Sequence, residues 1–126
     1  MNLYLDTQVM VWLCEGQGGK LTPAAVAAIE ESDLLISPMV LLELGYLYGI
    51  KRILKPPMML LHQLATQIGL KQSDHPFASV MEAALFETWT RDPFDRVIVA
   101  HARADGIVRL VTSDSQIREN YPRAVW

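Results

Sequence analysis

Four acidic residues stand where a folded chain could bring their carboxylates together: Asp6, Glu43, Asp95 and Asp114. Carboxylates that converge in one cleft repel one another, and a hard divalent cation relieves that repulsion. Ligands that are all oxygen select Mg²⁺ or Mn²⁺. Such an ion can activate water and stabilise both the attacking and the leaving oxygen of a phosphodiester. These residue types therefore indicate hydrolytic phosphoryl transfer.

Each acid also has a structural explanation. Asp6 and Asp114 can cap the helices that follow them, and Asp95 falls at the third helical position after the Asp92-Pro93 helix start, where the helix dipole favours an acid. Glu43 is the only charge in the apolar segment 38–48, which we expect to form a mostly buried helix. A buried carboxylate is costly unless it is paired, hydrogen-bonded or bound to a cation, so Glu43 favours the site interpretation.

The elements that must position these acids follow from hydrophobic periodicity. Short strands are predicted at 2–6, 33–37, 70–72, 107–112 and 124–126, and helices at 9–13, 22–30, 38–48, 58–69, 77–89, 93–105 and 115–118. Asp6 and Asp114 thus close strands, at the edge where α/β folds carry functional groups. In the helix that begins at Pro93, we expect Val97 and Ile98 to face the core, with Arg96, His101, Arg103 and Asp105 nearer water.

Length and composition indicate one α/β domain over residues 1–126, with a mostly parallel sheet of four to five short strands between helices. The chain has one cysteine and a formal net charge of −3, which disfavours binding of nucleic acid by electrostatics alone. No signal peptide or membrane-spanning pattern is evident, so we expect a soluble, cytoplasmic protein that does not associate with membranes.

The residues around these acids resemble a PIN domain, and more narrowly the small VapC toxins of toxin–antitoxin pairs. The resemblance is carried by Tyr4-Leu5-Asp6-Thr7, Leu42-Glu43-Leu44, Arg91-Asp92-Pro93-Phe94-Asp95-Arg96 with Ala100-His101-Ala102, and Leu110-Val111-Thr112-Ser113-Asp114. It implies a metal-dependent ribonuclease that forms a homodimer and is inhibited by a cognate antitoxin. Asp6, Glu43 and Asp95 match the principal acids and Asp114 a fourth, with the hydroxyls of Thr7 and Thr112 beside them.

The leading hypothesis is therefore an Mg²⁺- or Mn²⁺-dependent endoribonuclease toxin that cleaves RNA with metal-activated water, with Glu43 as a candidate base. Alternatives are an acid-cluster phosphatase, a DNA nuclease and a non-enzymatic, receiver-like domain that binds Mg²⁺. Against the last, no lysine follows Asp114. RNA-binding candidates are Arg91, Arg96, Lys51 and Arg52, although each could be ordinary solvated charge. The apolar residues proposed for the dimer surface are Tyr46, Tyr48, Met58, Met59 and Leu61.

Overall fold

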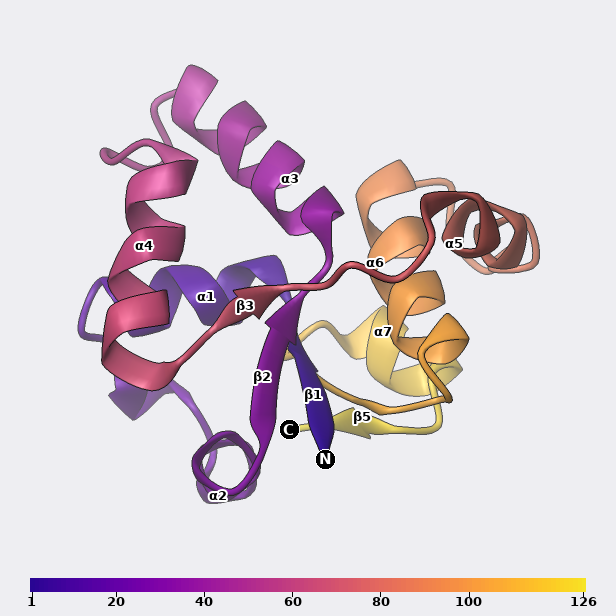
Figure 1. Ribbon diagram of the computed structural model, residues 1–126, viewed down its shortest axis with the longest axis horizontal. Coiled ribbons are helices and arrows are strands. Elements are labelled where there is room, and N and C mark those ends of the chain that lie inside the picture. Colours follow the sequence, from indigo (N-terminus) through magenta and orange to yellow (C-terminus); the bar gives the residue numbers. More distant parts are fainter.

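A five-stranded, entirely parallel sheet forms the centre of the chain in the computed structural model, which describes residues 1–126 (Figure 1). Its strands are β1 (Asn2–Leu5), β2 (Asp33–Ile36), β3 (Lys71–Gln72), β4 (Arg109–Val111) and β5 (Ala124–Val125). Their order across the sheet is β3-β2-β1-β4-β5, so β1 is central and the order reverses between β1 and β4. This arrangement confirms the predicted α/β class, and it makes the carboxyl ends of β1 and β4 the expected place for a site.

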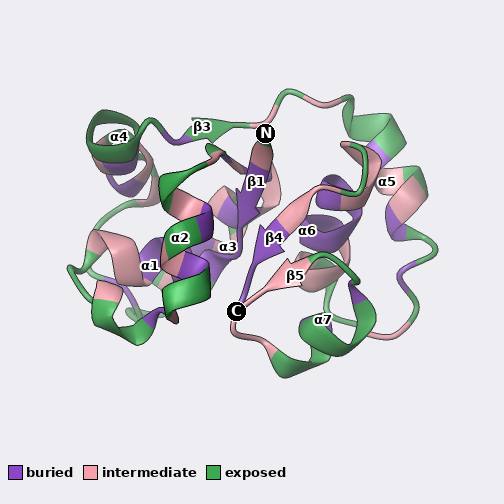
Figure 2. Cartoon of the chain, turned by 90° about the horizontal axis from the view of Figure 1, so that it is seen from below, coloured by how far each residue is buried: buried purple, intermediate pink, exposed green.

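Helices lie on both sides of the sheet, with α1, α2 and α4 on one side and α5 and α6 on the other (Figures 1 and 2). The helices are α1 (Thr7–Cys14), α2 (Pro23–Glu30), α3 (Pro38–Gly49), α4 (Pro57–Ile68), α5 (Phe77–Ala84), α6 (Pro93–Ala104) and α7 (Ser115–Asn120), with a single 3₁₀ turn at Gly18–Lys20. Proline stands in the first turn of four of them, α2, α3, α4 and α6, where its missing N–H has no helical partner. None of these helices is both long and apolar enough to cross a membrane.

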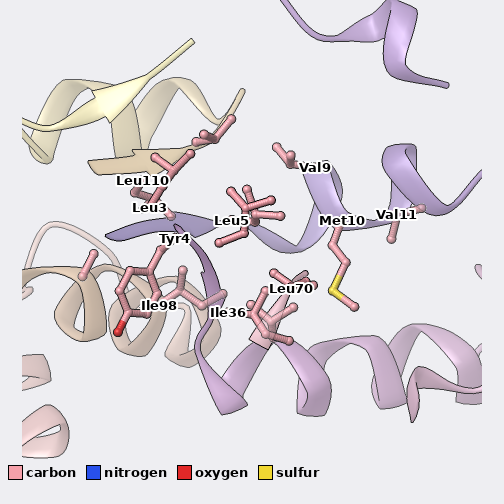
Figure 3. Close-up of a cluster of buried hydrophobic side chains, with 14 of the residues drawn as sticks. Leu3, Tyr4, Leu5, Val9, Met10, Val11, Ile36, Leu70, Ile98 and Leu110 are labelled. Atoms are coloured by element: carbon pink, nitrogen blue, oxygen red, sulfur yellow. The ribbon is translucent and has the colours of Figure 1, made fainter. Parts of the chain in front are cut away.

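The core is built around β1, because this strand is covered on both faces. Leu3, Tyr4 and Leu5 are completely buried. Side chains alternate along a strand, so Leu5 points toward Met10, whereas Tyr4 points to the other side, toward Ile98 of α6 (Figure 3). Central strands of parallel sheets read as continuous apolar runs for this reason.

The helix predicted over 77–89 is wrong in its second half, because α5 ends at Ala84. Leu85 and Phe86 continue the apolar pattern, yet they are 70% and 84% exposed. Glu87 ends the apolar run and is buried, where its carboxylate accepts hydrogen bonds at 2.6 Å from Arg103 Nε and Trp89 Nε1. Burial of this acid ends the helix, and the residues that follow Ala84 form an irregular segment that leads to α6.

Two further sequence expectations fail on burial. The helix α3 is not buried on most of its surface, since only Val40 and Leu44 are buried and Leu42 and Tyr46 are exposed. Its outer apolar face is only partly covered: the Tyr46 ring lies 6.2 Å from the Phe94 ring, centroid to centroid, yet Tyr46 remains 57% exposed. His101 was expected nearer water but is 3% exposed, because β1, β2 and the segment after β3 cover that part of α6.

Candidate active site

Asp6 lies at the end of β1, where both of its carboxylate oxygens already accept hydrogen bonds. Oδ1 accepts from the Thr7 backbone N–H at 2.8 Å, and Oδ2 accepts from the Thr112 hydroxyl at 2.7 Å. The backbone N–H of Asp6 bonds to Val111 at 3.0 Å, which fixes the end of β1 against β4. Asp6 is therefore both the cap of α1 and a rigid, 8% exposed member of the site.

Glu43 reaches the same region from α3. Its Oε1 accepts a 2.5 Å hydrogen bond from the hydroxyl of Thr7, the residue that follows Asp6. Glu43 is half-buried and has no basic partner, because no ion pair in the structure includes it. Thr7 thus joins the acid on α3 to the acid at the end of β1.

The first turn of α6 supplies Asp95. Asp92 Oδ1 accepts from the backbone N–H groups of Phe94 and Asp95 at 2.8 and 3.3 Å, which confirms Asp92 as the helix cap. The side chain of Asp95 accepts no hydrogen bond and forms no ion pair, so capping does not account for this acid. Asp95 is half-buried at the positive end of the α6 dipole.

Asp114 caps α7, as its Oδ1 accepts from the Ile117 backbone N–H at 2.9 Å. Its own backbone N–H donates to the Thr112 hydroxyl oxygen at 3.1 Å, and that hydroxyl donates to Asp6. Thr112 therefore connects the two acids at the ends of β1 and β4. The structure places both predicted threonines, Thr7 and Thr112, in direct contact with site acids.

The electrostatics show that the four acids share one region. Burial, together with the negative charges of Asp92, Asp6, Asp114 and Glu43, raises the pKa of Asp95 to about 7. Burial is also the main cause of the raised pKa values of Asp6 and Glu43, opposed by their threonine hydrogen bonds. Carboxylates with raised pKa values and no Lys or Arg partner lack a compensating positive charge.

The donor set fits a hard divalent cation in its chemistry, since every candidate ligand is a carboxylate oxygen. However, no three His, Cys, Asp or Glu side chains lie close enough together to hold an ion by themselves. An ion bound here would therefore need water or substrate oxygens as further ligands. Mg²⁺ commonly binds in this way, through one or two carboxylates together with waters and phosphates.

The basic candidates do not form one patch. Arg91 is exposed, whereas Arg96 donates through Nε and Nη2 to the backbone oxygens of Ala84 and Leu85 at 3.3 and 3.2 Å. Arg96 thus fastens the end of α5 to α6. Lys51 and Arg52 are exposed beyond the end of α3, whose last residue, Gly49, lies roughly 9 Å along the helix from Glu43.

Sequence reasoning missed two anchors of this site. Glu87 was placed within a predicted helix, although an acid inside an apolar pattern could have indicated a buried ion pair. Ser37 follows β2 and caps α3 by accepting from the Met39 backbone N–H at 3.2 Å. Its hydroxyl also contacts His101, and no local sequence pattern indicates that long-range contact.

A parallel α/β domain with carboxylates at its strand-order reversal belongs to the class of folds that can support divalent-cation phosphoryl chemistry. A sequence model of the PIN domain matches residues 3–121, which is nearly the whole chain, and the protein therefore belongs to the PIN domain family. PIN domains are nucleases and generally use divalent metals, so membership supports a hydrolase of phosphodiester bonds.

Two solved structures show the same fold at low sequence identity. The first is VapBC2 from Rickettsia felis bound to a DNA fragment from its promoter, at 20% identity and a TM-score of 0.65, with 98% of this chain and 96% of that chain covered. The second is DNA-bound VapBC from Salmonella typhimurium, at 20% identity and a TM-score of 0.55, with 98% and 95% covered. A search of curated protein sequences gave no significant match.

Proposed function

We propose that this protein is an Mg²⁺-dependent endoribonuclease and the toxin component of a toxin–antitoxin pair, acting in the cytoplasm. The observation that carries the proposal is that Asp6, Glu43 and Asp114 lie near enough to Asp95 for their charges to raise its pKa, and that none of the four acids forms an ion pair. PIN family membership supports nuclease activity, and the VapBC neighbours support a toxin and its antitoxin.

Each acid has a distinct part in the proposed site. Asp6 and Asp95 would hold Mg²⁺ or Mn²⁺ directly, with Glu43 and Asp114 completing the acidic cluster and with water or phosphate oxygens as the further ligands. Such an ion, when bound, would neutralise charge at the phosphate and make water more acidic. Glu43, whose pKa burial raises, is the proposed base, and the Thr7 hydroxyl orients it. Thr112 keeps Asp6 in place.

The proposed RNA path uses positive charge outside the acidic cluster. Arg91 is exposed and immediately precedes Asp92, so it is the favoured phosphate contact. Arg96 is a second proposed phosphate contact, with its guanidinium held at the end of α5 by the Ala84 and Leu85 carbonyls. Lys51 and Arg52 would contact a more distant part of a long RNA. Phosphate contacts of this kind position RNA without reading its sequence.

The proposed partners are a second copy of this chain and an antitoxin. Exposed apolar side chains gather on α3 and α4, with Tyr46 57%, Tyr48 42%, Met58 62% and Met59 53% exposed and Leu61 partly buried. Surfaces of this kind mark protein interaction sites. The proposed antitoxin covers the four acids and blocks access of RNA.

A cleavage assay tests the enzyme. With Mg²⁺, purified protein should cut a labelled RNA, and chelator, Asp6→Asn or Asp95→Asn should reduce the rate by about a thousandfold or more, because each removes the cation or one of its ligands. Glu119→Gln, which removes an exposed acid of α7, should leave the rate unchanged. Undiminished cleavage by both Asn variants would refute the site.

Parallel substrates distinguish the alternatives. Single-stranded DNA and a phosphate monoester should be poor substrates if the enzyme is a ribonuclease. Preferential hydrolysis of either would indicate a DNA nuclease or a phosphatase instead. Phosphorylation by a small-molecule phosphodonor without nuclease activity would favour the receiver-like alternative.

A further inference from the structure

His101 lies at the centre of a partly buried hydrogen-bond chain that runs from Asp105 and Tyr4 through Ser73 to Ser37. Its Nδ1 is 2.9 Å from the Ser37 hydroxyl, and its Nε2 is 3.0 Å from the Ser73 hydroxyl. The ring also packs against Tyr4, with 5.4 Å between ring centroids. A histidine with both nitrogens bonded and almost no exposure is fixed in one orientation.

The donors and acceptors fix the direction of every hydrogen bond in this hydrogen-bond chain. The Asp105 carboxylate can only accept, so the Tyr4 hydroxyl donates to it at 2.9 Å and the Ser73 hydroxyl donates to the Tyr4 oxygen at 2.9 Å. Ser73 then accepts from His101 Nε2–H, which leaves Nδ1 to accept from the Ser37 hydroxyl. Every group in this chain is satisfied by the neutral ring with its hydrogen on Nε2.

The chain connects three elements that carry site acids. Ser37 caps α3, the helix of Glu43, by accepting from the Met39 backbone N–H. His101 lies two turns after Asp95 on α6, and Tyr4 lies two residues before Asp6 on β1. The acids repel one another, so the scaffold has to hold the helices together against that repulsion. The only side-chain hydrogen bond that holds Glu43 itself comes from Thr7.

We propose that His101 is a positioning residue for the nuclease site. Acting through Ser37, it fixes the first turn of α3 against α6 and so sets the placement of Glu43 relative to Asp95. This inference rests on the proposed nuclease function. It assigns His101 no contact with RNA or metal, and it predicts that the Ser37 branch of the chain matters more than the Ser73 branch.

Substitutions of the chain test the proposal. His101→Leu removes both hydrogen bonds of the ring at a position that borders an apolar pocket of about 180 Å³. His101→Gln keeps an amide that can donate and accept. Ser37→Ala removes the hydrogen bond between His101 and the start of α3. Ser73→Ala is the matched control, because it cuts the chain on the other side of His101. The readouts are the single-turnover rate of RNA cleavage per folded molecule, Mn²⁺ affinity by calorimetry and hydrogen exchange of the Met39 amide.

His101→Leu and Ser37→Ala should slow cleavage about 10- to 100-fold, weaken Mn²⁺ binding and speed Met39 exchange, since a small misplacement of a site group is costly. His101→Gln should recover most of the rate, and Ser73→Ala should stay within about threefold of the native rate. The double variant Ser37→Ala/His101→Leu should be no slower than the slower single variant, because both break the same link. If His101→Leu does not fold, Ser37→Ala and His101→Gln carry the test.

Three results would overturn the proposal. They are native rates and Mn²⁺ affinity in a folded His101→Leu or Ser37→Ala variant, additive losses in the double variant, and a Ser73→Ala defect equal to that of Ser37→Ala. If native protein cuts no RNA, the proposed function fails. Mn²⁺ affinity and Met39 exchange then still decide whether His101 positions the acids.

Discussion

Threonine hydroxyls, rather than basic side chains, hold two of the four site acids. Thr112 is fully buried, and its hydroxyl donates to Asp6 while accepting from the backbone N–H of Asp114. The Thr7 hydroxyl likewise donates a hydrogen bond to the Glu43 carboxylate. Neutral hydroxyl donors orient a carboxylate but leave its negative charge available to a cation.

Thr112→Val should therefore slow RNA cleavage, because an isosteric side chain without a hydroxyl frees one oxygen of Asp6. We expect a loss of about tenfold or more in single-turnover rate at saturating Mg²⁺. Thr112→Ser keeps the hydroxyl and should remain within about threefold of the native rate. Equal rates in the Val and Ser variants would show that this hydrogen bond does not matter for the site.

The stability of the fold should fall in acid partly because of His101. Burial lowers the pKa of this ring from 6.5 to about 4, reinforced by His75 and opposed by Asp105; Tyr4 also faces the ring. Between pH 6.5 and pH 4 the unfolded chain binds the proton and the folded chain does not, so this contribution is intact above pH 6.5 and decreases as the pH falls toward 4. At about 1.4 kcal/mol per pH unit, the loss approaches about 3 kcal/mol.

Urea unfolding from pH 7 to pH 4 checks this expectation. The free energy of unfolding of His101→Gln is measured over the same pH range and subtracted from that of the native protein. The contribution of the carboxylates, which both proteins share, cancels, and the contribution of His101 remains. A difference between the two profiles that stays constant over this range would mean that His101 does not titrate as described.

At the scale of elements, the irregular segment between α5 and α6 is held by one buried acid. The Glu87 carboxylate, with a side chain 4% exposed, pairs with Arg103 of α6, and the guanidinium of Arg103 lies 5.1 Å from the ring centroid of Tyr121. This anchor ties the segment that precedes α6 to the body of that helix, whose third residue is Asp95.

Arg103→Met should destabilise the fold, because it leaves Glu87 buried with only Trp89 as a donor. Removal of one partner of a buried pair costs several kcal/mol, and the partial exposure of Arg103 reduces this to about 2 kcal/mol. The free energy of unfolding in urea measures the loss, with the exposed Arg118→Met as control. A change in Arg103→Met no larger than that of the control would contradict the anchoring role.

At the scale of the whole molecule, the exposed apolar face of α3 and α4 predicts self-association. Sedimentation velocity at tens of micromolar should give a dimer for the native chain. Tyr46→Glu/Met58→Glu should give a monomer, because it places two charges in the buried centre of the proposed interface. Phe86→Glu, at an exposed apolar position after α5 and outside the proposed interface, should stay dimeric. A native monomer would refute the prediction.

The sequence by itself determined the parallel α/β class and the positions of the candidate acids at strand ends and helix starts. Periodicity and helix caps are local properties, so the strand ending at Asp6 and the helix beginning at Asp92-Pro93 could be predicted from neighbouring residues. The chemistry of carboxylates at strand ends then indicated where a cation would be needed.

Only the tertiary structure decided burial, because burial depends on segments distant in sequence. It placed His101 against Ser37 and Ser73, ended α5 before the buried Glu87, and left the apolar face of α3 only partly covered. Helical periodicity identifies an apolar face but not the element that covers it. The hydrogen bonds that hold Asp6 and Glu43 in place come from Thr112, after β4, and from Thr7, at the start of α1, so no local pattern could predict them.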